Sequence, residues 1–453
     1  MNTQLTIPRR LGAITLALCT MGFVSCVHAP APVNQTAVRA DTTPREKHTT
    51  APVAPAEQSK TREPAHSPAV AKSTSAKTNH AATAANSNPT TAAPSTTPAA
   101  EAPPEAVAAG ENWCGVVKLY YATDRTWTGS TKQPKWYGHE WNEKSEDHLT
   151  YGTCSVTIPV KFHQPGLVEK PSIWSLEFAE DPERHVIVQK PRMLERDPFF
   201  KALSEAVSGR EQKDIVVFIH GFNNTFDDAV SRLGVLAYDM QFNGVPVLYS
   251  WCSRGGTWGV RAYPSDEERV AKTIRPLAGF LGRVADVGRE AGARRINIVA
   301  HSMGNRALVG AFQLLALQKK GELLFDEAVM AAPDVPATGF ATDEWPHMQG
   351  PAKRVTLYAS ADDKALIASK NVHEFRRLGE GGDGILLMPG LDTIDASGCD
   401  FSLLGLNHSY FGGKKVLSDL RELIEQGLSP LERKLREKKL GALPCWLLPD
   451  VVP

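Results

Sequence analysis

The segment INIVAHSMGN, residues 296–305, contains a serine whose surroundings could make it a nucleophile. A short apolar run ends at Ala300, and the pattern of an amphipathic helix begins after Ser302. Ala300 and Gly304 are small residues placed two positions on either side of the serine. A nucleophile elbow needs small residues at this spacing, because its strand and helix approach each other closely. The pattern indicates either a nucleophilic Ser302 or a serine that only caps the following helix.

A second group of residues could stabilise the negative charge that such a nucleophile creates. His220, Gly221 and Phe222 close an earlier apolar run, DIVVFIHGF. A loop at this place can offer one backbone N–H to an oxyanion, and the residue after the nucleophile can offer another. The candidate donors are therefore Phe222 and Met303. The alternative is a simple glycine turn with His220 packed in the core.

An acid and a base follow Ser302 in the chain. Asp334 and the pair Asp362 and Asp363 each follow a predicted strand, and His408 stands in a loop before the last helix. Serine, then aspartate, then histidine is the chain order of the α/β-hydrolases. Adjacent residues of an extended loop point to opposite sides, so Asp362 and Asp363 cannot both face the histidine.

Several stretches together carry a family resemblance: YYATDR, YGTCSVTIP, VVFIHGFNNTFDDAV, LYSW, NIVAHSMGNR, AAPDV, LYASADDKAL and NHSYF. The chain resembles a bacterial family of α/β hydrolases of unassigned function, grouped broadly with esterases and lipases. The resemblance implies Ser302 as nucleophile, His408 as base and the Phe222 region in the oxyanion hole. It favours Asp363 as the acid, because this residue directly precedes KAL. It implies no substrate.

The elements that would position these residues alternate between strands and helices. Apolar runs rich in β-branched residues predict buried parallel strands at 214–222, 245–251, 295–300, 327–334 and 354–360. Helices are expected from Ser265, where a capping box begins, to Ala291, after Ser302, at 414–426 and around 430–439. Residues 113–200 contain further strand-like runs. The predicted fold class is α/β: an α/β-hydrolase fold whose mostly parallel central sheet has helices on both faces and an antiparallel N-terminal edge.

The first quarter of the chain differs in composition from the rest. Arg9 and Arg10 precede an apolar stretch that ends at Ser25, which predicts a signal peptide over residues 1–25. Cys26 follows a segment that resembles a lipobox, so we expect it to carry a lipid; a plain cleaved signal or an uncleaved anchor remains an alternative. Residues 26–111 are dominated by Ala, Pro, Thr and Ser and predict a disordered tether, spanning on the order of 50 Å. Residues 112–453 are the predicted hydrolase domain.

Composition narrows the possible partners. The 50 basic and 50 acidic residues give a net charge of zero, and without a basic stripe we expect no nucleic-acid partner. No Cys/His cluster has zinc-ligand spacing, so neither a metal nor another cofactor is expected. The chain has five cysteines after Cys26, and a pair such as Cys114 and Cys154 could close in an oxidising compartment.

The expected function is that of an envelope-tethered serine hydrolase. Its substrate would be a carboxylic ester, either a small molecule or a lipid, and its membrane contact would be a lipid on Cys26, facing the periplasm or the outer surface. Without that lipid, the protein would be secreted. Acyl transfer by the same three residues, or a non-catalytic binding protein with a hydrolase fold, remain alternatives.

Overall fold

A computed structural model describes residues 114–171, 179–256, 261–363, 366, 375–399 and 412–449. All of them belong to one compact unit, Ala99–Pro453. The predicted signal peptide, the predicted tether, Cys26 and His408 lie outside the described residues. Within the described part of the chain, no helix is long and apolar enough to cross a membrane.

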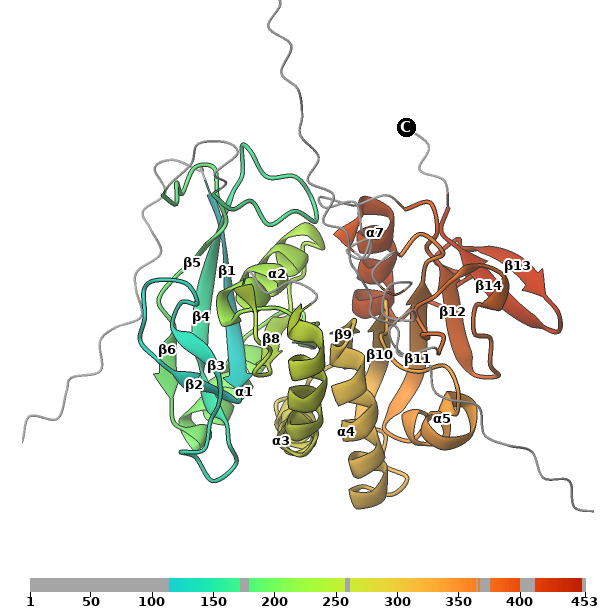
Figure 1. Ribbon diagram of the computed structural model, residues 1–453, viewed down its shortest axis with the longest axis horizontal. Helices are drawn as coiled ribbons and strands as arrows, with labels where there is room; N and C mark the ends of the chain where they lie inside the picture. The colour runs from blue at the N-terminus through green and yellow to red at the C-terminus, as the bar shows by residue number, and fades with distance from the viewer. Residues whose placement is uncertain are drawn as a thin grey trace, which may run out of the picture. The chain divides into compact units, whose positions relative to one another are not determined.

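The described unit is built on a 12-stranded sheet (Figure 1). In sheet order the strands are β13 (Arg436–Leu440), β14 (Leu443–Leu447), β12 (Leu391–Asp395), β11 (Ala352–Ala359), β10 (Phe325–Ala331), β9 (Arg295–His301), β7 (Asp214–Ile219), β8 (Val245–Ser250), β1 (Cys114–Thr123), β4 (Thr150–Pro159) and β5 (Ile187–Val188), with β6 (Arg192–Leu194) also paired to β4. A separate two-stranded sheet joins β2 (Arg125–Trp127) to β3 (Tyr137–Trp141).

Neighbouring strands are parallel from β14 across to β1. At the N-terminal edge β4 runs antiparallel to β1, β5 and β6, which confirms the predicted antiparallel edge. Every residue of β7, β8 and β10 is buried, as expected for parallel strands covered on both faces. The carboxyl ends of β7, β9, β10 and β11 therefore meet at one edge of the sheet.

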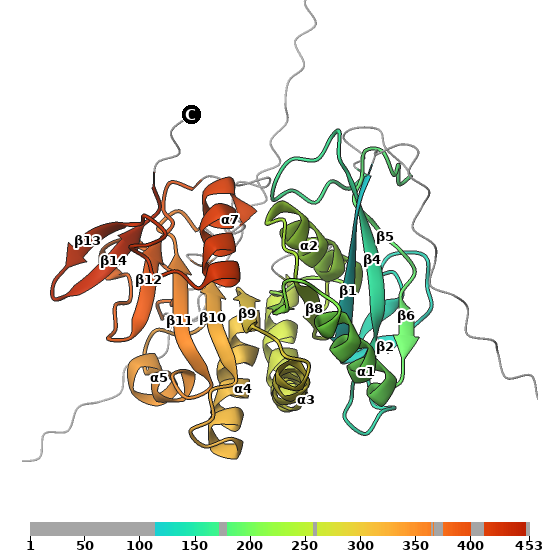
Figure 2. The same cartoon turned by 180° about the vertical axis from the view of Figure 1, so that it is seen from behind.

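Helices cover both faces of this sheet. They are α1 (Arg196–Ser208), α2 (Phe226–Asp239), α3 (Tyr263–Glu290), α4 (Gly304–Gln318), α5 (Trp345–Met348) and α7 (Lys414–Arg421), the last continuing into a π-helical turn (Glu422–Gln426). Apolar residues of α1, α3, α4 and α5 belong to one core cluster, and those of α2 and α7 belong to a second. Helices α3 and α4 lie side by side in both views (Figures 1 and 2).

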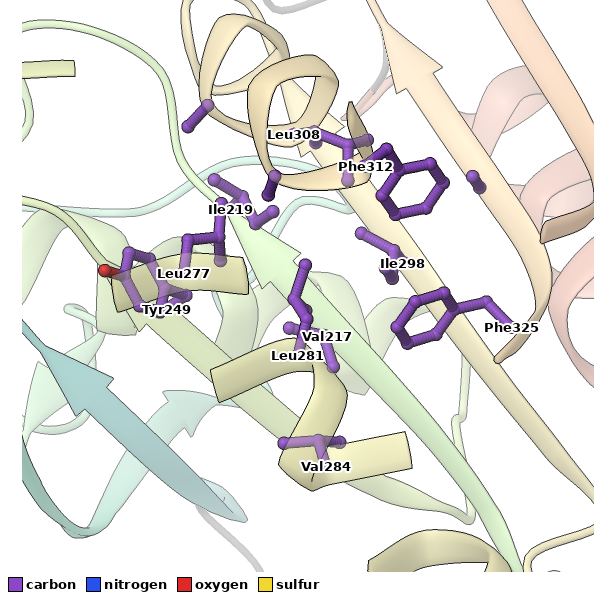
Figure 3. Packing of buried hydrophobic residues seen from close by; sticks show 14 of the residues in the cluster. Val217, Ile219, Tyr249, Leu277, Leu281, Val284, Ile298, Leu308, Phe312 and Phe325 are labelled. Atoms are coloured by element: carbon purple, nitrogen blue, oxygen red, sulfur yellow. The ribbon is translucent and has the colours of Figure 1, made fainter. Parts of the chain in front are cut away.

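The larger core cluster fixes α3 and α4 on the strands that carry the site. Leu281 and Val284 of α3 and Val217 of β7 belong to this cluster and are labelled in Figure 3. Phe312 of α4 stacks on Phe325 of β10 with ring centroids 5.6 Å apart. Both helices thereby bury their apolar stripes against the middle of the sheet, which holds their N-terminal ends at its carboxyl edge.

Two predicted helix features differ from the structure. Helix α3 begins at Tyr263, and its N-cap residue is Ala262, whose methyl side chain cannot accept a hydrogen bond. Ser265 lies inside the first turn, so the expected capping box there is wrong. The helix expected around residues 430–439 is wrong as well, since β13 occupies Arg436–Leu440 and pairs with β14. The exposed charges of β13 suit an edge strand, where they discourage pairing with another chain.

The suggested Cys114–Cys154 disulfide is also wrong. Both cysteines are free. The β1–β4 register pairs Cys114 with Pro159 and Cys154 with Leu119, so the two cysteines are five positions apart along the ladder. Five strand positions span about 17 Å, whereas a disulfide requires Cα atoms within about 7 Å.

Candidate active site

Ser302 lies between β9 and α4 in a strained backbone conformation. Its φ of 53° is in the left-handed region, which side chains other than glycine rarely adopt. Its backbone N–H donates to the Ala331 carbonyl at 2.9 Å, and its own carbonyl accepts from the N–H groups of Asn305 and Asp334 at 3.1 and 3.2 Å. These bonds to the flanking strand β10 and helix α4 hold the strained conformation in place.

The structure does not support the alternative of a capping serine. The N-cap residue of α4 is Met303, and no side-chain hydrogen bond caps this helix. Helix α2 shows a true cap: Thr225 has an extended backbone with φ −76°, and its side chain accepts a hydrogen bond from the Asp228 N–H. The conformation of Ser302 is therefore the one expected at a nucleophile elbow, and not that of a cap.

Two glycines allow the close approach that this elbow requires. A Cβ atom on Gly304 would lie 2.4 Å from the His220 carbonyl oxygen and 2.8 Å from that of Ile219. A Cβ atom on Gly221 would lie 2.9 Å from the Ser302 Cβ. The loop after β7 is thus in direct contact with the Ser302 side chain, as the sequence pattern predicts.

Asn305 supports the elbow, and the sequence reasoning did not identify it. Its Nδ2 lies within hydrogen-bond distance of three carbonyl oxygens, those of Ala300 (3.0 Å), Ser302 (3.1 Å) and Ala331 (3.3 Å). The side chain is completely buried. The available signal was its place in NIVAHSMGNR, three residues after the serine, where a buried amide can bond the carbonyls of a tight turn.

The two candidate oxyanion donors have the required backbone groups. No acceptor among the described residues takes up the N–H of Phe222 or of Met303. Met303 is fully buried, and the Phe222 ring packs edge-on against Tyr263 with centroids 5.6 Å apart. Two N–H groups beside a serine, with no acceptor in the described part of the chain, could bind an oxyanion.

Arg125 anchors the loop that carries Phe222. Its guanidinium is buried and donates to the carbonyls of Asn224 (2.7 Å) and Ser253 (2.8 Å) and to the Ser250 hydroxyl (3.0 Å). These bonds connect β2 to the loops that follow β7 and β8. Arg125 ends the YYATDR stretch, and its positioning role was not evident from the sequence.

Asp266 of α3 fixes the same loop from the other side. Its carboxylate accepts from the Asn223 N–H at 2.8 Å, the Ser253 hydroxyl at 2.6 Å and the Arg254 N–H at 2.7 Å. The side chain is fully buried, and these three donors compensate for the loss of water. The loop beside Ser302 is therefore rigidly supported before any ligand binds.

His220 is a packed core histidine. Its ring stacks on Trp251 with centroids 5.2 Å apart, and its Nδ1 lies 2.7 Å from the Gly221 carbonyl oxygen. Burial first, and then the charge of Arg125, lower the pKa of His220 to about 3. The imidazole is neutral at pH 7, which agrees with the packing interpretation of this residue.

The three candidate acids have different surroundings. Asp363 is completely buried, and its Oδ1 accepts from the Leu366 N–H at 3.1 Å. Asp362 is exposed, and its Oδ2 accepts from the Gly398 N–H at 2.7 Å. The two neighbours thus differ in exposure, as expected for adjacent residues that point to opposite sides.

Asp334 is already held by a buried ionic network. Its Oδ1 lies 3.2 Å from the Arg377 Nε, and its Oδ2 accepts from the Tyr263 hydroxyl at 2.6 Å. The Arg306 guanidinium lies 3.4 Å from the same Oδ2. A carboxylate with these partners neutralises arginines, and it is poorly placed to orient a histidine as well.

The structure brings four of the predicted site residues to the carboxyl edge of the sheet: Ser302, Met303, Phe222 and Asp363. His408 falls outside the described residues, so its place beside them remains a prediction. Among the described residues there is no cluster of three or more His, Cys, Asp or Glu side chains that could hold a metal ion.

Comparisons with known proteins give one family match. The model of the family described as alpha/beta hydrolase of unknown function (DUF900) matches residues 196–426. No curated protein matches the chain. Among solved structures, phospholipase PlaB from Legionella pneumophila in complex with thio-NAD is similar over 52% of this chain and 67% of that chain, at 11% identity and a TM-score of 0.23, which is too low to support an argument. Because the family model covers just over half of the 453 residues, including Ser302 and Asp363, this chain belongs to the alpha/beta hydrolases of unknown function.

Proposed function

We propose that this protein is a serine hydrolase that cleaves carboxylic esters, with Ser302 as nucleophile, His408 as general base and Asp363 as the orienting acid. The observation that carries the proposal is the left-handed backbone of Ser302 at the β9–α4 junction. Strain of this kind costs on the order of 1–3 kcal/mol and persists only where surrounding bonds enforce it. A serine that merely capped a helix would have no need of it.

The chemistry follows from these residue types. His408 removes the hydroxyl proton while the Ser302 Oγ attacks the ester carbonyl carbon. The carbonyl oxygen becomes an oxyanion, which accepts hydrogen bonds from the N–H groups of Phe222 and Met303, each worth about 3 kcal/mol in the transition state. Collapse of the tetrahedral intermediate expels the alcohol, which takes the proton from His408. Water then attacks the acyl-serine by the same route and releases the acid.

Asp363 is the preferred acid because its competitors have other roles. Asp334 is engaged by Arg377 and Tyr263, and Asp362 is exposed at the surface. A buried carboxylate at the end of β11 can accept the Nδ1–H of a histidine, hold its tautomer and stabilise its cation. In the elbow geometry these groups need no metal or organic cofactor.

Steady-state hydrolysis of p-nitrophenyl acetate by the full chain tests the proposal. We expect measurable turnover in the unaltered protein and a loss of at least about 10³-fold in Ser302→Ala. The thermal midpoint of this variant should change little, because only one hydroxyl is removed. Equal turnover in both proteins would refute the proposal, and the absence of any turnover would favour a binding protein.

A further inference from the structure

The segment that follows β4 contains a buried histidine held between two carboxylates. The His163 side chain is only 5% exposed. Its Nε2 lies 2.7 Å from the Asp239 Oδ1, its Nδ1 lies 3.0 Å from the Glu169 Oε2, and the Tyr238 ring packs edge-on against it. Because a neutral imidazole has only one N–H, both contacts are favourable only when the ring is protonated. We call His163, Glu169 and Asp239 the His163 cluster.

The charges around His163 also favour its cation. Arg232 of α2 interacts electrostatically with Asp239, so a protonated His163 gives two cations beside the two carboxylates of the cluster. Asp228 of α2 faces Arg232 as well, but it forms an ion pair with Lys170. A neutral His163 would leave one buried carboxylate without a compensating charge, which costs free energy.

Asp239 connects the His163 cluster to the backbone of Gly166. Its second oxygen, Oδ2, accepts from the Gly166 N–H at 2.6 Å. The Arg232 Nη1 donates to the Gly166 carbonyl oxygen at 2.8 Å. Gly166 has a φ of 83°, in the region that glycine adopts without strain. Side chains of α2 therefore hold both polar groups of this backbone unit.

Gly166 lies directly against Gly412, which precedes α7. A Cβ atom on Gly166 would overlap the Gly412 carbonyl oxygen, and a Cβ atom on Gly412 would lie 3.3 Å from the Gly166 carbonyl oxygen. The two backbones thus meet where a side chain would not fit. Gly412 follows His408 by four residues. Four residues of extended chain span at most about 14 Å.

Resting on the proposed ester hydrolysis, we propose that His163 is a positioning residue for the general base His408. Through Asp239, the protonated ring holds Gly166 against Gly412, and this contact fixes the chain four residues after the base. A general base must lie within hydrogen-bond reach of the hydroxyl that it deprotonates. A misplacement of about 1 Å can lower the rate on the order of 10²-fold, so the anchor matters for catalysis.

The titration of His163 gives this role a pH signature. Burial by itself would lower the pKa of His163, but the hydrogen bonds and charges of Asp239 and Glu169 raise it to about 9. The folded pKa is above the unfolded value of about 6.5, so the stabilisation is complete below that value and is lost as pH rises through 9. We therefore expect the contact with Gly412 to weaken, and turnover to fall, above pH 9.

Turnover of p-nitrophenyl acetate at pH 8 and pH 10 tests the proposal, with the Ser302→Ala protein as the blank. His163→Gln is the informative variant, because its amide is uncharged at both pH values. At pH 8 we expect its kcat to be about tenfold below that of the unaltered protein, with KM within about twofold, since the chemical step and not binding is affected. At pH 10 the two kcat values should converge, because His163 is then neutral as well.

Gly166→Ala tests the backbone contact without changing a charge. We expect its kcat to be about tenfold lower at both pH values, and hydrogen exchange of the amides at residues 412–417 to be faster. Gly321→Ala is the matched control: its φ is also positive, at 75°, but no atom lies within 4 Å of the added Cβ. This control should leave kcat and the exchange at residues 412–417 unchanged.

The outcomes separate a positioning role from a purely structural one. Each kcat is expressed per site that reacts with a fluorophosphonate probe, so a smaller folded fraction does not imitate the effect. A ratio of kcat between the unaltered and His163→Gln proteins that stays the same at pH 8 and pH 10 would overturn the proposal, as would unchanged kcat in Gly166→Ala. Absence of turnover in the unaltered protein would instead refute ester hydrolysis; hydrogen exchange in His163→Gln at pH 8 would still decide whether the His163 cluster holds Gly412.

Discussion

At the residue scale, the choice of acid depends on what each carboxylate already contacts. Asp334 lies nearer to Ser302 in the chain, but its oxygens are used by two arginines and a tyrosine. Asp363 is as deeply buried, and its Oδ1 accepts a hydrogen bond from the Leu366 N–H. The sequence could reduce the candidates for the catalytic acid to three aspartates. Only the structure distinguishes among them, because ion pairs between distant segments leave no periodic pattern in the sequence.

Exchanging each carboxylate for an amide tests this assignment. In Asp363→Asn we expect turnover of p-nitrophenyl acetate to fall by about 10⁴-fold, since an amide cannot hold the histidine tautomer or stabilise its cation. In Asp334→Asn the main loss should be stability, about 3 kcal/mol in urea unfolding, because Arg377 keeps its buried charge without a partner. Asp362→Asn is the exposed control. Collapse of turnover in Asp334→Asn with normal turnover in Asp363→Asn would move the acid to the end of β10.

The buried neutral His220 predicts a pH effect on stability. Its folded pKa is about 3, below the value near 6.5 of an unfolded histidine. Between these values the unfolded chain binds a proton that the folded chain does not, so this residue makes stability fall as pH falls from about 6.5 toward 3. Asp124 and Glu327 act in the opposite direction, because burial raises their pKa to about 6 and about 7.

A variant isolates the contribution of His220. We expect His220→Asn to lower stability at pH 7 but to lose less additional stability between pH 7 and pH 4 than the unaltered protein loses. Urea unfolding at the two pH values measures this difference. A larger pH-dependent loss in the variant would contradict the assignment of a neutral, packed imidazole.

At the element scale, the elbow depends on how closely α4 approaches the end of β7. Apolar runs and helical spacing were sufficient to predict β7, β8, β9, β10, β11 and the parallel sheet. These patterns did not predict the C-terminal edge of the sheet. There the charged segment Arg436–Leu440 forms β13, because it can pair with the neighbouring strand β14. The secondary-structure propensity of a segment carries no information about which distant strand it will pair with. The roles of Arg125 and Asp266 in holding the loop beside Ser302 could not be predicted, because their hydrogen bonds join segments that are far apart in the chain.

Two glycine substitutions compare the elbow with an ordinary helix. Gly304→Ala should destabilise the protein by about 1–3 kcal/mol and reduce turnover, because its Cβ would overlap the His220 carbonyl oxygen. Gly279→Ala is the matched control: it lies in α3 with no atom within 4 Å of the new Cβ, and it should gain up to about 1 kcal/mol from helix propensity. Thermal or urea unfolding measures both. Equal effects at the two sites would mean that the elbow tolerates a side chain.

At the scale of the whole molecule, we propose that the hydrolase domain is held in the cell envelope by a lipid on Cys26 and the tether of residues 26–111. The support lies in the sequence: a basic and apolar leader precedes the cysteine, and a long segment without large apolar residues follows it. A tether of this composition would let the domain reach substrates away from the membrane surface.

Fractionation of cells tests the anchor. Full-length protein should sediment with membranes, and Cys26→Ala should be released or remain unprocessed. Cys19→Ala, in the leader itself, is the control and should still sediment. A soluble and correctly processed unaltered protein would contradict lipidation without affecting the assignment of the active site.

Covalent labelling decides whether Ser302 is an activated nucleophile. The full chain would be treated with a fluorophosphonate probe, digested and analysed by mass spectrometry. We expect one phosphonyl adduct, on the Ser302 side chain, and no labelling in Ser302→Ala. An adduct on another residue, or undiminished labelling of the Ser302→Ala protein, would contradict it.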